Sequence, residues 1–285
     1  MKTPRSLARF DAFRHDYFTR LQHHPSCQPE FLYYARQQLQ RIVDAGALCL
    51  RVPERSLEDI LKSGRIKEVV ECGGGTTMGG AETRKEVVKA LFNAETEKMA
   101  PREFPKFGYL GPVKARQDFF GNPDMAYQYG NVRFVLKRDT VAANTTLTVG
   151  DSVNFGACYY MVPTRITDIL PTCFIGLPNR DDIREGIKAL HRQTADPLLR
   201  LKVFCSLCFD RKLTPENFVQ FAEIAQDMPG MEFFELQYHG ELSLDQDVEA
   251  IEIMDWTDDT PEICRKLQPL AKKHNLELKL VSMGI

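Results

Sequence analysis

Apolar and polar residues alternate most clearly in the segment 231–239. Side chains along a strand point to opposite faces in turn. One face of this segment is therefore apolar, and it carries Phe234, Leu236 and Tyr238. The other carries a carboxylate, an amide and an imidazole, those of Glu235, Gln237 and His239. The alternation predicts a strand with one face on a core and the other presenting polar groups, although an ordinary half-exposed strand has the same pattern.

The same reading along the chain predicts alternating helices and strands. Helical periodicity marks 6–24, 31–43, 82–92, 178–228 and 260–275. Strand patterns mark 47–52, 129–137, 145–149, 250–254 and 276–280. The segment 99–130 is rich in Pro, Gly and aromatic residues and is predicted to be a long loop. We therefore expect an α/β (α+β) fold with a helical N-terminal segment, 1–46, and a domain over 47–285 that contains a helical insertion at about 178–228.

Composition places the chain among globular proteins. Apolar residues make up 43% of its 285 residues and charged residues 27%. The formal charge of −2 gives no electrostatic reason to expect nucleic acid or an anionic membrane as a partner. No apolar run reaches the roughly 20 residues of a membrane helix, and the N-terminus lacks the apolar region of a classical secretory signal.

Cysteine usage favours reduced, buried thiols. Several of the eight cysteines lie in apolar strand-like runs, as Cys49 does. Cys205 and Cys208 have the spacing of a metal-ligand or redox pair, but no second pair accompanies them and their neighbours are apolar. We therefore predict no metal site.

Three polar residues occur on or at the end of predicted strands, in the order Arg51, Ser152 and Glu235. This order resembles the Arg–Ser–Glu arrangement of mono-ADP-ribosyltransferases. Several phrases spread over about 45–255 resemble more closely the CteC-type bacterial effectors, which modify a threonine of ubiquitin. They are Leu50–Pro53, Ile60–Arg65, Tyr129–Val132, Thr146–Ser152 and Glu235–Gly240. The resemblance implies a split, mixed β-sheet core of the ADP-ribosyltransferase type, with NAD as the substrate.

Cleavage of the bond between nicotinamide and ribose passes through an oxocarbenium-like state. A carboxylate close to the ribose stabilises that positive charge, and Glu235 is the candidate. Arg51 offers two parallel donors to the pyrophosphate or the ribose. Ser152 is expected to orient the base and the glutamate, with Thr146 and Thr148 as reserves. Further candidates for binding NAD are Gly74 and Thr76 in the glycine-rich segment, Phe107 or Tyr109 as the aromatic stacked on nicotinamide, and Gln237 beside the carboxylate.

One departure from the family pattern concerns the acceptor. Many of these transferases carry the catalytic carboxylate at the second position of a Gln/Glu-x-Glu motif, whereas the carboxylate comes first in Glu235-Leu-Gln237. With no second acid there, His239 or Asp151 is the candidate that activates an acceptor hydroxyl.

The expected activity is transfer of ADP-ribose from NAD to a hydroxyl side chain of a host protein, which the resemblance implies is a threonine of ubiquitin, so that ubiquitin signalling is blocked. The resemblance also implies export by a specialised bacterial secretion system and action in the host cytosol. An NAD glycohydrolase and a non-catalytic binding module on the same fold remain alternatives. Each site residue also has a structural alternative: Arg51 pairing with Glu86, Ser152 in an ordinary turn, the aromatics as packing, and His239 as a structural histidine.

Overall fold

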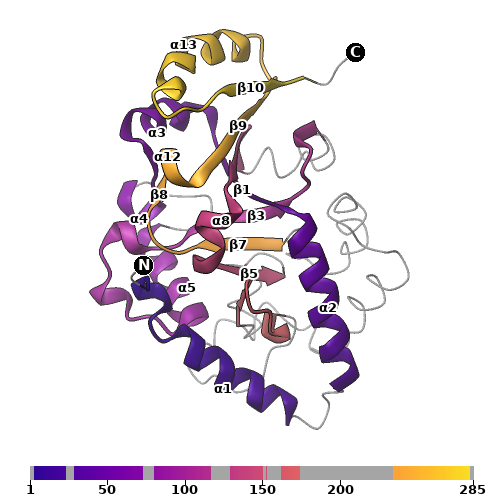
Figure 1. Ribbon diagram of the computed structural model, residues 1–285. Helices are drawn as coiled ribbons and strands as arrows, with labels where there is room; N and C mark the ends of the chain where they lie inside the picture. The colour runs from indigo at the N-terminus through magenta and orange to yellow at the C-terminus, as the bar shows by residue number, and fades with distance from the viewer. Residues whose placement is uncertain are drawn as a thin grey trace, which may run out of the picture.

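A computed structural model describes most of the chain outside its central third (Figure 1). The described residues are 3–23, 29–72, 80–116, 129–149, 152, 162–173 and 234–282. The predicted helical insertion at 178–228 lies outside them, as do Gly74, Thr76, Asp151, Cys205 and Cys208. None of the described helices is long and apolar enough to cross a bilayer.

The described strands form an eight-stranded sheet in the order β10-β9-β4-β1-β3-β7-β5-β6, and a separate pair, β2-β8. Their bounds are β1 Ala47–Val52, β2 Arg65–Ile66, β3 Lys106–Gly111, β4 Val132–Leu136, β5 Thr145–Val149, β6 Thr164–Arg165, β7 Phe234–Tyr238, β8 Leu242–Ser243, β9 Val248–Met254 and β10 Leu278–Val281. Only β9 and β10 pair in parallel in the large sheet. The expected α/β class with a mixed sheet is confirmed, but the described ladder is continuous, without the expected split.

Helices border this sheet, and the predicted ones over 6–24, 31–43, 82–92 and 260–275 are all present with small shifts at their ends. The longer helices are α1 Phe10–Gln22, α2 Pro29–Ala45, α3 Leu57–Ser63, α5 Ala81–Phe92 and α13 Thr260–Lys272. Single-turn helices are α4 Val69–Cys72, α8 Arg138–Val141 and α12 Leu244–Asp247. Short 3₁₀ turns are η1 Arg5–Leu7, η2 Glu54–Ser56, η3 Thr96–Lys98, η4 Pro101–Glu103, η5 Ala142–Asn144 and η7 Pro171–Cys173.

The prediction of an unbroken loop over 99–130 was wrong for β3, which lies between β1 and β7 near the middle of the sheet. Glycine normally weakens a strand, and it marks a place where another group approaches the backbone closely. A Cβ at Gly108 would lie 2.2 Å from the Cys49 carbonyl oxygen and 2.6 Å from the Tyr238 ring. The glycine that suggested a loop is therefore required inside the sheet.

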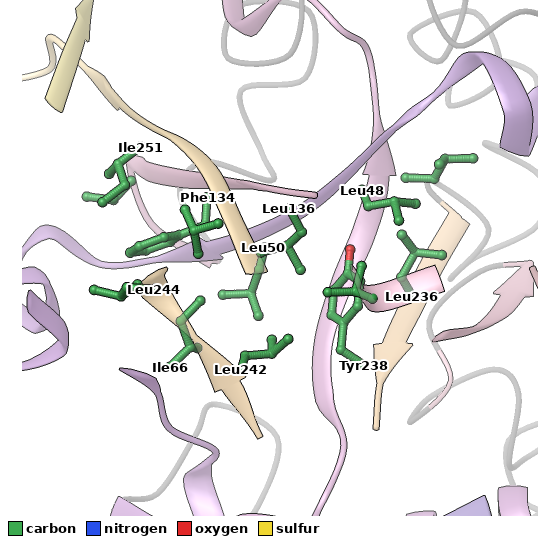
Figure 2. Packing of buried hydrophobic residues seen from close by; sticks show 14 of the residues in the cluster. Leu48, Leu50, Ile66, Phe134, Leu136, Leu236, Tyr238, Leu242, Leu244 and Ile251 are labelled. Atoms are coloured by element: carbon green, nitrogen blue, oxygen red, sulfur yellow. The ribbon is translucent and has the colours of Figure 1, made fainter. Parts of the chain in front are cut away.

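The main core covers one face of the sheet (Figure 2). Leu50, Leu236 and Tyr238 meet there with Phe134 and Ile251 from β4 and β9. Ile66, Leu242 and Leu244, from the small sheet and α12, close over them. The faces of β7 are thus divided as the alternation predicts.

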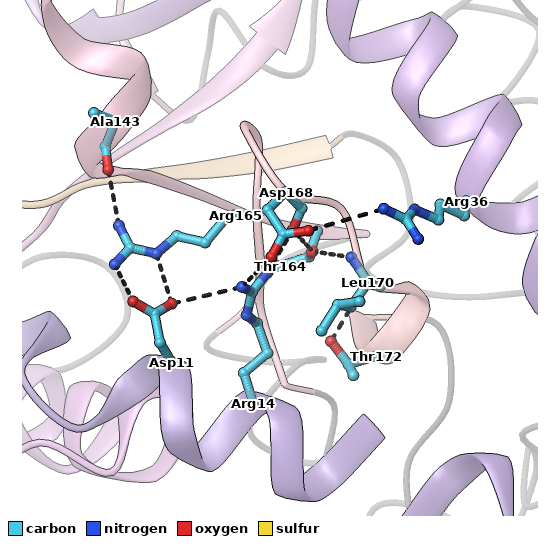
Figure 3. A network of polar contacts seen from close by, with 9 residues as sticks. All are labelled: Asp11, Arg14, Arg36, Ala143, Thr164, Arg165, Asp168, Leu170 and Thr172. Atoms are coloured by element: carbon cyan, nitrogen blue, oxygen red, sulfur yellow. Dashed lines mark hydrogen bonds and ion pairs between the residues drawn. The ribbon is translucent and has the colours of Figure 1, made fainter. Parts of the chain in front are cut away.

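The N-terminal segment packs against the rest of the chain in two ways. Leu7 and Phe10 join a second core cluster with Val88 and Phe92 of α5. A network of charges also fastens α1 to the far edge of the sheet (Figure 3), where Arg165 of β6 contacts Asp11 through Nε at 3.0 Å and Nη2 at 2.7 Å. These contacts hold the segment 3–22 against the strands that carry the polar face.

Candidate functional site

The polar face of the sheet is assembled by cross-strand register. Residues that pair across a ladder project to the same face. Tyr109 of β3 pairs with Cys49 of β1 on one side and with Glu235 of β7 on the other. Thr148 of β5 pairs with Glu235 in turn. Arg51, two residues beyond Cys49, shares this face, so the register brings Arg51, Tyr109 and Glu235 onto one surface of three adjacent strands.

Glu235 lies at the centre of this face and is buried, with 6% of its surface exposed. Its Oε2 accepts a hydrogen bond from the backbone N–H of Ser152 at 2.6 Å and a longer one from Gln237 Nε2 at 3.4 Å. Burial of a carboxyl group costs less free energy when hydrogen-bond donors contact it. Ser152 therefore lies next to Glu235 as predicted, although its contact is through the backbone.

The hydroxyl of Ser152 has a different environment from its N–H. The side chain is fully buried, and its Oγ has no hydrogen-bond partner among the residues that the structure describes. A buried hydroxyl without a partner is unusual and costs free energy, on the order of 1–3 kcal/mol. This oxygen is therefore available to a substrate hydroxyl or amide that reaches Glu235.

Arg51 is held by an aromatic residue of the neighbouring strand. Its Nε donates to the Tyr109 hydroxyl at 3.0 Å, and its guanidinium carbon lies 5.4 Å from the Tyr109 ring centroid. Glu86, the alternative partner considered from sequence, is exposed on α5. Arg51 is itself 93% buried, with 7% exposed, and such a cation is best matched by an anion.

A second buried arginine lies directly across the ladder, because Arg51 pairs with Arg133 of β4. Arg133 Nη2 donates to the Pro112 carbonyl at 2.6 Å, and Nε lies 3.5 Å from the Glu252 carboxylate. Arg51, Arg133 and Glu252 thus follow one another across β1, β4 and β9. The sequence analysis missed Arg133, although the alternation in β4 places it on the same face as Val135.

The two aromatics proposed for nicotinamide lie in β3 and not in a loop, which corrects that expectation. Phe107 pairs with Gln237, and Tyr109 pairs with Glu235, so both are close to the carboxylate. The Arg84 guanidinium covers the Phe107 ring at 3.9 Å from its centroid and is paired with Glu68 at 3.2 Å. One face of Phe107 is therefore already occupied.

His239 lies just beyond β7, and both its ring nitrogens are engaged. Nδ1 is 2.8 Å from Ser6 Oγ, and Nε2 is 2.9 Å from Thr146 Oγ1. Burial, with the nearby positive charges of Arg165 and Lys106, lowers the pKa of His239 well below its usual value. A buried neutral imidazole with both nitrogens engaged fits the structural alternative better than the acceptor-activating role. Asp151, the other candidate for that role, lies outside the described residues.

Lys106, which contributes to that low pKa, is held as a structural cation. Its Nζ donates to three carbonyl oxygens, those of Arg102, Phe104 and Gly240, at 2.7, 3.1 and 2.7 Å. Burial lowers the pKa of Lys106 to about 8. Within the described part of the chain, no cluster of histidine, cysteine and acidic side chains is placed to hold a metal ion.

Comparison of the chain with models of protein families and with curated proteins finds no match in either set. Among the proposed residues, Arg51, Phe107, Tyr109, Ser152, Glu235 and Gln237 are brought together; Gly74, Thr76 and Asp151 are outside the described residues.

Proposed function

We propose that this protein is a mono-ADP-ribosyltransferase that moves ADP-ribose from NAD to a hydroxyl side chain of another protein. The observation that carries the proposal is the grouping of Arg51, Tyr109 and Glu235 on one buried sheet face, with Ser152 hydrogen-bonded to the glutamate. A carboxylate and a guanidinium on one face suit the two parts of a nucleotide sugar, since the ribose is cationic in the transition state and the pyrophosphate is anionic throughout.

Each residue has a specific task in the proposed reaction. The bond between ribose C1′ and the nicotinamide nitrogen breaks, and its electron pair leaves with nicotinamide. Glu235 stabilises the positive charge that develops on the ribose. Arg51, oriented by Tyr109, binds the pyrophosphate. The acceptor oxygen then forms a new bond to C1′ and loses its proton to solvent or to a nearby base.

The unpartnered Ser152 hydroxyl supports the proposed position of the ribose. Ser152 donates its backbone N–H to Glu235, and its buried Oγ has no hydrogen-bond partner among the described residues. We propose that a ribose hydroxyl bound by Glu235 is the partner of this oxygen. The hydroxyl thus gains a substrate partner where the described residues provide none.

A direct experiment follows substrate and product together. The wild-type protein is incubated with labelled NAD and purified ubiquitin, and free ADP-ribose and the intact mass of ubiquitin are measured. One added ADP-ribose unit on ubiquitin is expected for wild type and not for Glu235→Gln. If a lysate protein other than ubiquitin becomes labelled, the transferase activity is supported and the acceptor is a different protein. If the protein neither binds nor cleaves NAD, the proposal is refuted and the alternative of a non-catalytic binding module remains.

The second candidate is an NAD glycohydrolase, and the state of His239 favours it. Both imidazole nitrogens are committed to Ser6 and Thr146, so His239 is not free to activate a protein hydroxyl. Water can then be the acceptor. Release of free ADP-ribose at the same rate with and without any added protein would identify this activity.

A further inference from the structure

A row of hydrogen bonds connects the N-terminal turn η1 to Glu235 along β5 and β7. Ser6 Oγ contacts His239 Nδ1 at 2.8 Å, and His239 Nε2 contacts Thr146 Oγ1 at 2.9 Å. Thr146 Oγ1 contacts Gln237 Oε1 at 2.8 Å, and Gln237 Nε2 contacts Glu235 Oε2 at 3.4 Å. All five side chains are buried.

The direction of every bond in this row follows from its last member. Gln237 Nε2 donates to Glu235 Oε2, so the carbonyl oxygen of the same amide faces Thr146 and accepts from its hydroxyl. The single Thr146 hydroxyl hydrogen is then used on Gln237, so Thr146 must accept from His239 Nε2–H. A neutral imidazole protonated at Nε2 has a bare Nδ1, which must accept from the Ser6 hydroxyl.

Gln237 also donates to Thr148 Oγ1 at 2.9 Å, which fixes both hydrogens of its amide. Bonds that all point the same way polarise one another, and their combined effect exceeds that of separate pairs. A displacement of Ser6 would therefore change the hydrogen bond that Glu235 receives from Gln237.

We infer that Ser6, His239, Thr146 and Gln237 form a one-way hydrogen-bond chain that positions Glu235, so that the N-terminal segment completes the site. The catalytic consequence rests on the proposed function, whereas the direction of the chain does not. Thr146, His239 and Ser6 act here as positioning residues, since none of them contacts the glutamate.

The packing of the two ends supports this role. Ser6 is fully buried in η1, and the neighbouring Leu7 lies in the same core cluster as Phe92. The Phe92 ring meets the His239 ring edge-on, with centroids 4.6 Å apart. The imidazole is therefore held by packing as well as by two hydrogen bonds, and it cannot turn without moving η1 or α5.

Charged and titratable groups of three strands surround this chain. Tyr109 of β3 pairs with Glu235 across the ladder, and its hydroxyl accepts a hydrogen bond from Arg51 of β1. Arg165 of β6 and Lys106 of β3 are the cations whose positive charges lower the pKa of His239. Both cations favour the neutral imidazole that the one-way chain requires.

The kinetic test uses two threonines on the same strand. Thr146→Val removes the hydroxyl at nearly constant volume and interrupts the chain, whereas Thr146→Ser retains it. Thr145→Val is the matched control, because the buried Thr145 hydroxyl donates to the Val141 carbonyl at 2.7 Å and takes no part in the chain. NAD turnover is measured for wild type, these three variants and Ser6→Ala between pH 5 and 8, with the concentration of folded protein determined for each.

Thr146→Val is expected to lower kcat/KM about 10-fold, with most of the loss in kcat, and to move the acid limb of the pH profile to higher pH. Thr146→Ser should restore both values, and Ser6→Ala should lower kcat/KM about 3-fold. A purely structural role would lower activity equally at every pH. If Thr146→Val and Thr145→Val have the same profile, the positioning role is refuted.

The second measurement does not depend on NAD turnover. Nitrogen NMR distinguishes the protonated from the bare nitrogen of a neutral imidazole, and His239→Gln assigns the signal. We expect Nε2 to carry the proton at pH 7 and Nδ1 to be bare. A proton on Nδ1 would refute the direction of the chain, even if NAD turnover is normal. Conversely, a protein that does not cleave NAD but has the Nε2–H form would refute the proposed function alone.

Discussion

The two faces of β7 are built from neighbouring residues but are determined by different physical rules. Phe234, Leu236 and Tyr238 are buried in the main core, where volume and shape decide which side chain fits. On the opposite face, Glu235 and Gln237 are just as inaccessible to water, but each has named hydrogen-bond partners. The apolar face therefore determines whether the sheet forms, and the polar face determines what the sheet can bind.

This difference implies that the two faces respond to substitution in different measurable quantities. Removing volume from the apolar face leaves a cavity and lowers the free energy of unfolding. Changing the charge on the polar face at constant volume leaves the packing intact but removes a group that stabilises a transition state. A variant on each face, one residue apart, can test the division.

The largest effect is expected for Glu235→Gln. The amide is nearly the same size and can still accept from the Ser152 N–H through its oxygen. It carries no charge to stabilise the oxocarbenium-like state, so kcat for NAD cleavage should fall about 10³-fold, or roughly 4 kcal/mol. The free energy of unfolding, measured by urea denaturation, should change by less than about 1 kcal/mol. A variant that turns over NAD at half the wild-type rate would contradict the role of Glu235.

The neighbouring change Leu236→Ala should have the opposite profile. Leu236 is fully buried in the main core beside Leu147, its pairing partner in β5. Loss of its side chain should lower the free energy of unfolding by about 3 kcal/mol, within the range for buried leucines. The turnover per folded molecule should stay within twofold of wild type, because the polar face is unchanged. A large loss of turnover at full folded concentration would show that the two faces are not separable.

The alternation of residues was sufficient to predict these two faces, but not what lies next to them. The pattern from Phe234 to His239 predicts which side chains share a face, because backbone geometry alone fixes it. The strand β3 was missed, since Gly108 is required by a ring 130 residues away, that of Tyr238. The grouping of Arg51, Ser152 and Glu235 came from a resemblance to a family and not from spacing.

The contact between Ser6 and His239 shows why the rest of the site could not be predicted. It joins residues 233 positions apart, and neither the serine nor its short 3₁₀ turn has a sequence signal that indicates a partner. Arg133 is an intermediate case. The alternation in β4 predicts the face on which it lies, whereas its pairing with Arg51 depends on the order of the strands in the sheet. Local patterns give the face of a residue, and only the tertiary fold gives its neighbours.

A smaller effect is expected for Arg51→Lys, which keeps the charge but changes its shape. Lysine cannot offer two parallel donors to a phosphate, and it loses the guanidinium that Tyr109 orients. The KM for NAD should rise about 10-fold, equivalent to about 1.4 kcal/mol, with little change in kcat. Tyr109→Phe is the companion variant, since it removes the hydroxyl while the ring stays. An unchanged KM in both variants would remove Arg51 from the NAD site.

The smallest effect concerns the pH dependence of the free energy of unfolding. It tests His239 separately from the polar residues of β7. Burial and the cations Arg165 and Lys106 lower the pKa of His239 in the folded protein. Below the unfolded pKa of about 6.5, the unfolded chain therefore binds a proton that the folded protein does not. The stabilising contribution is complete above that pH and is lost as the pH falls through it toward the folded pKa.

The free energy of unfolding should thus decrease between pH 7 and pH 5.5, with a slope from this group of at most about 1.4 kcal/mol per pH unit. His239→Gln, which cannot titrate, should be less stable at pH 7 because Ser6 loses its acceptor, but its stability should vary less with pH. His274→Gln is the control. That histidine follows α13, contacts Asp245 at 2.9 Å and takes no part in the hydrogen-bond chain. Equal slopes for wild type and His239→Gln would mean that the imidazole takes up its proton in the folded protein as readily as in the unfolded chain. The one-way chain to Glu235 would then lose the neutral histidine on which its direction depends.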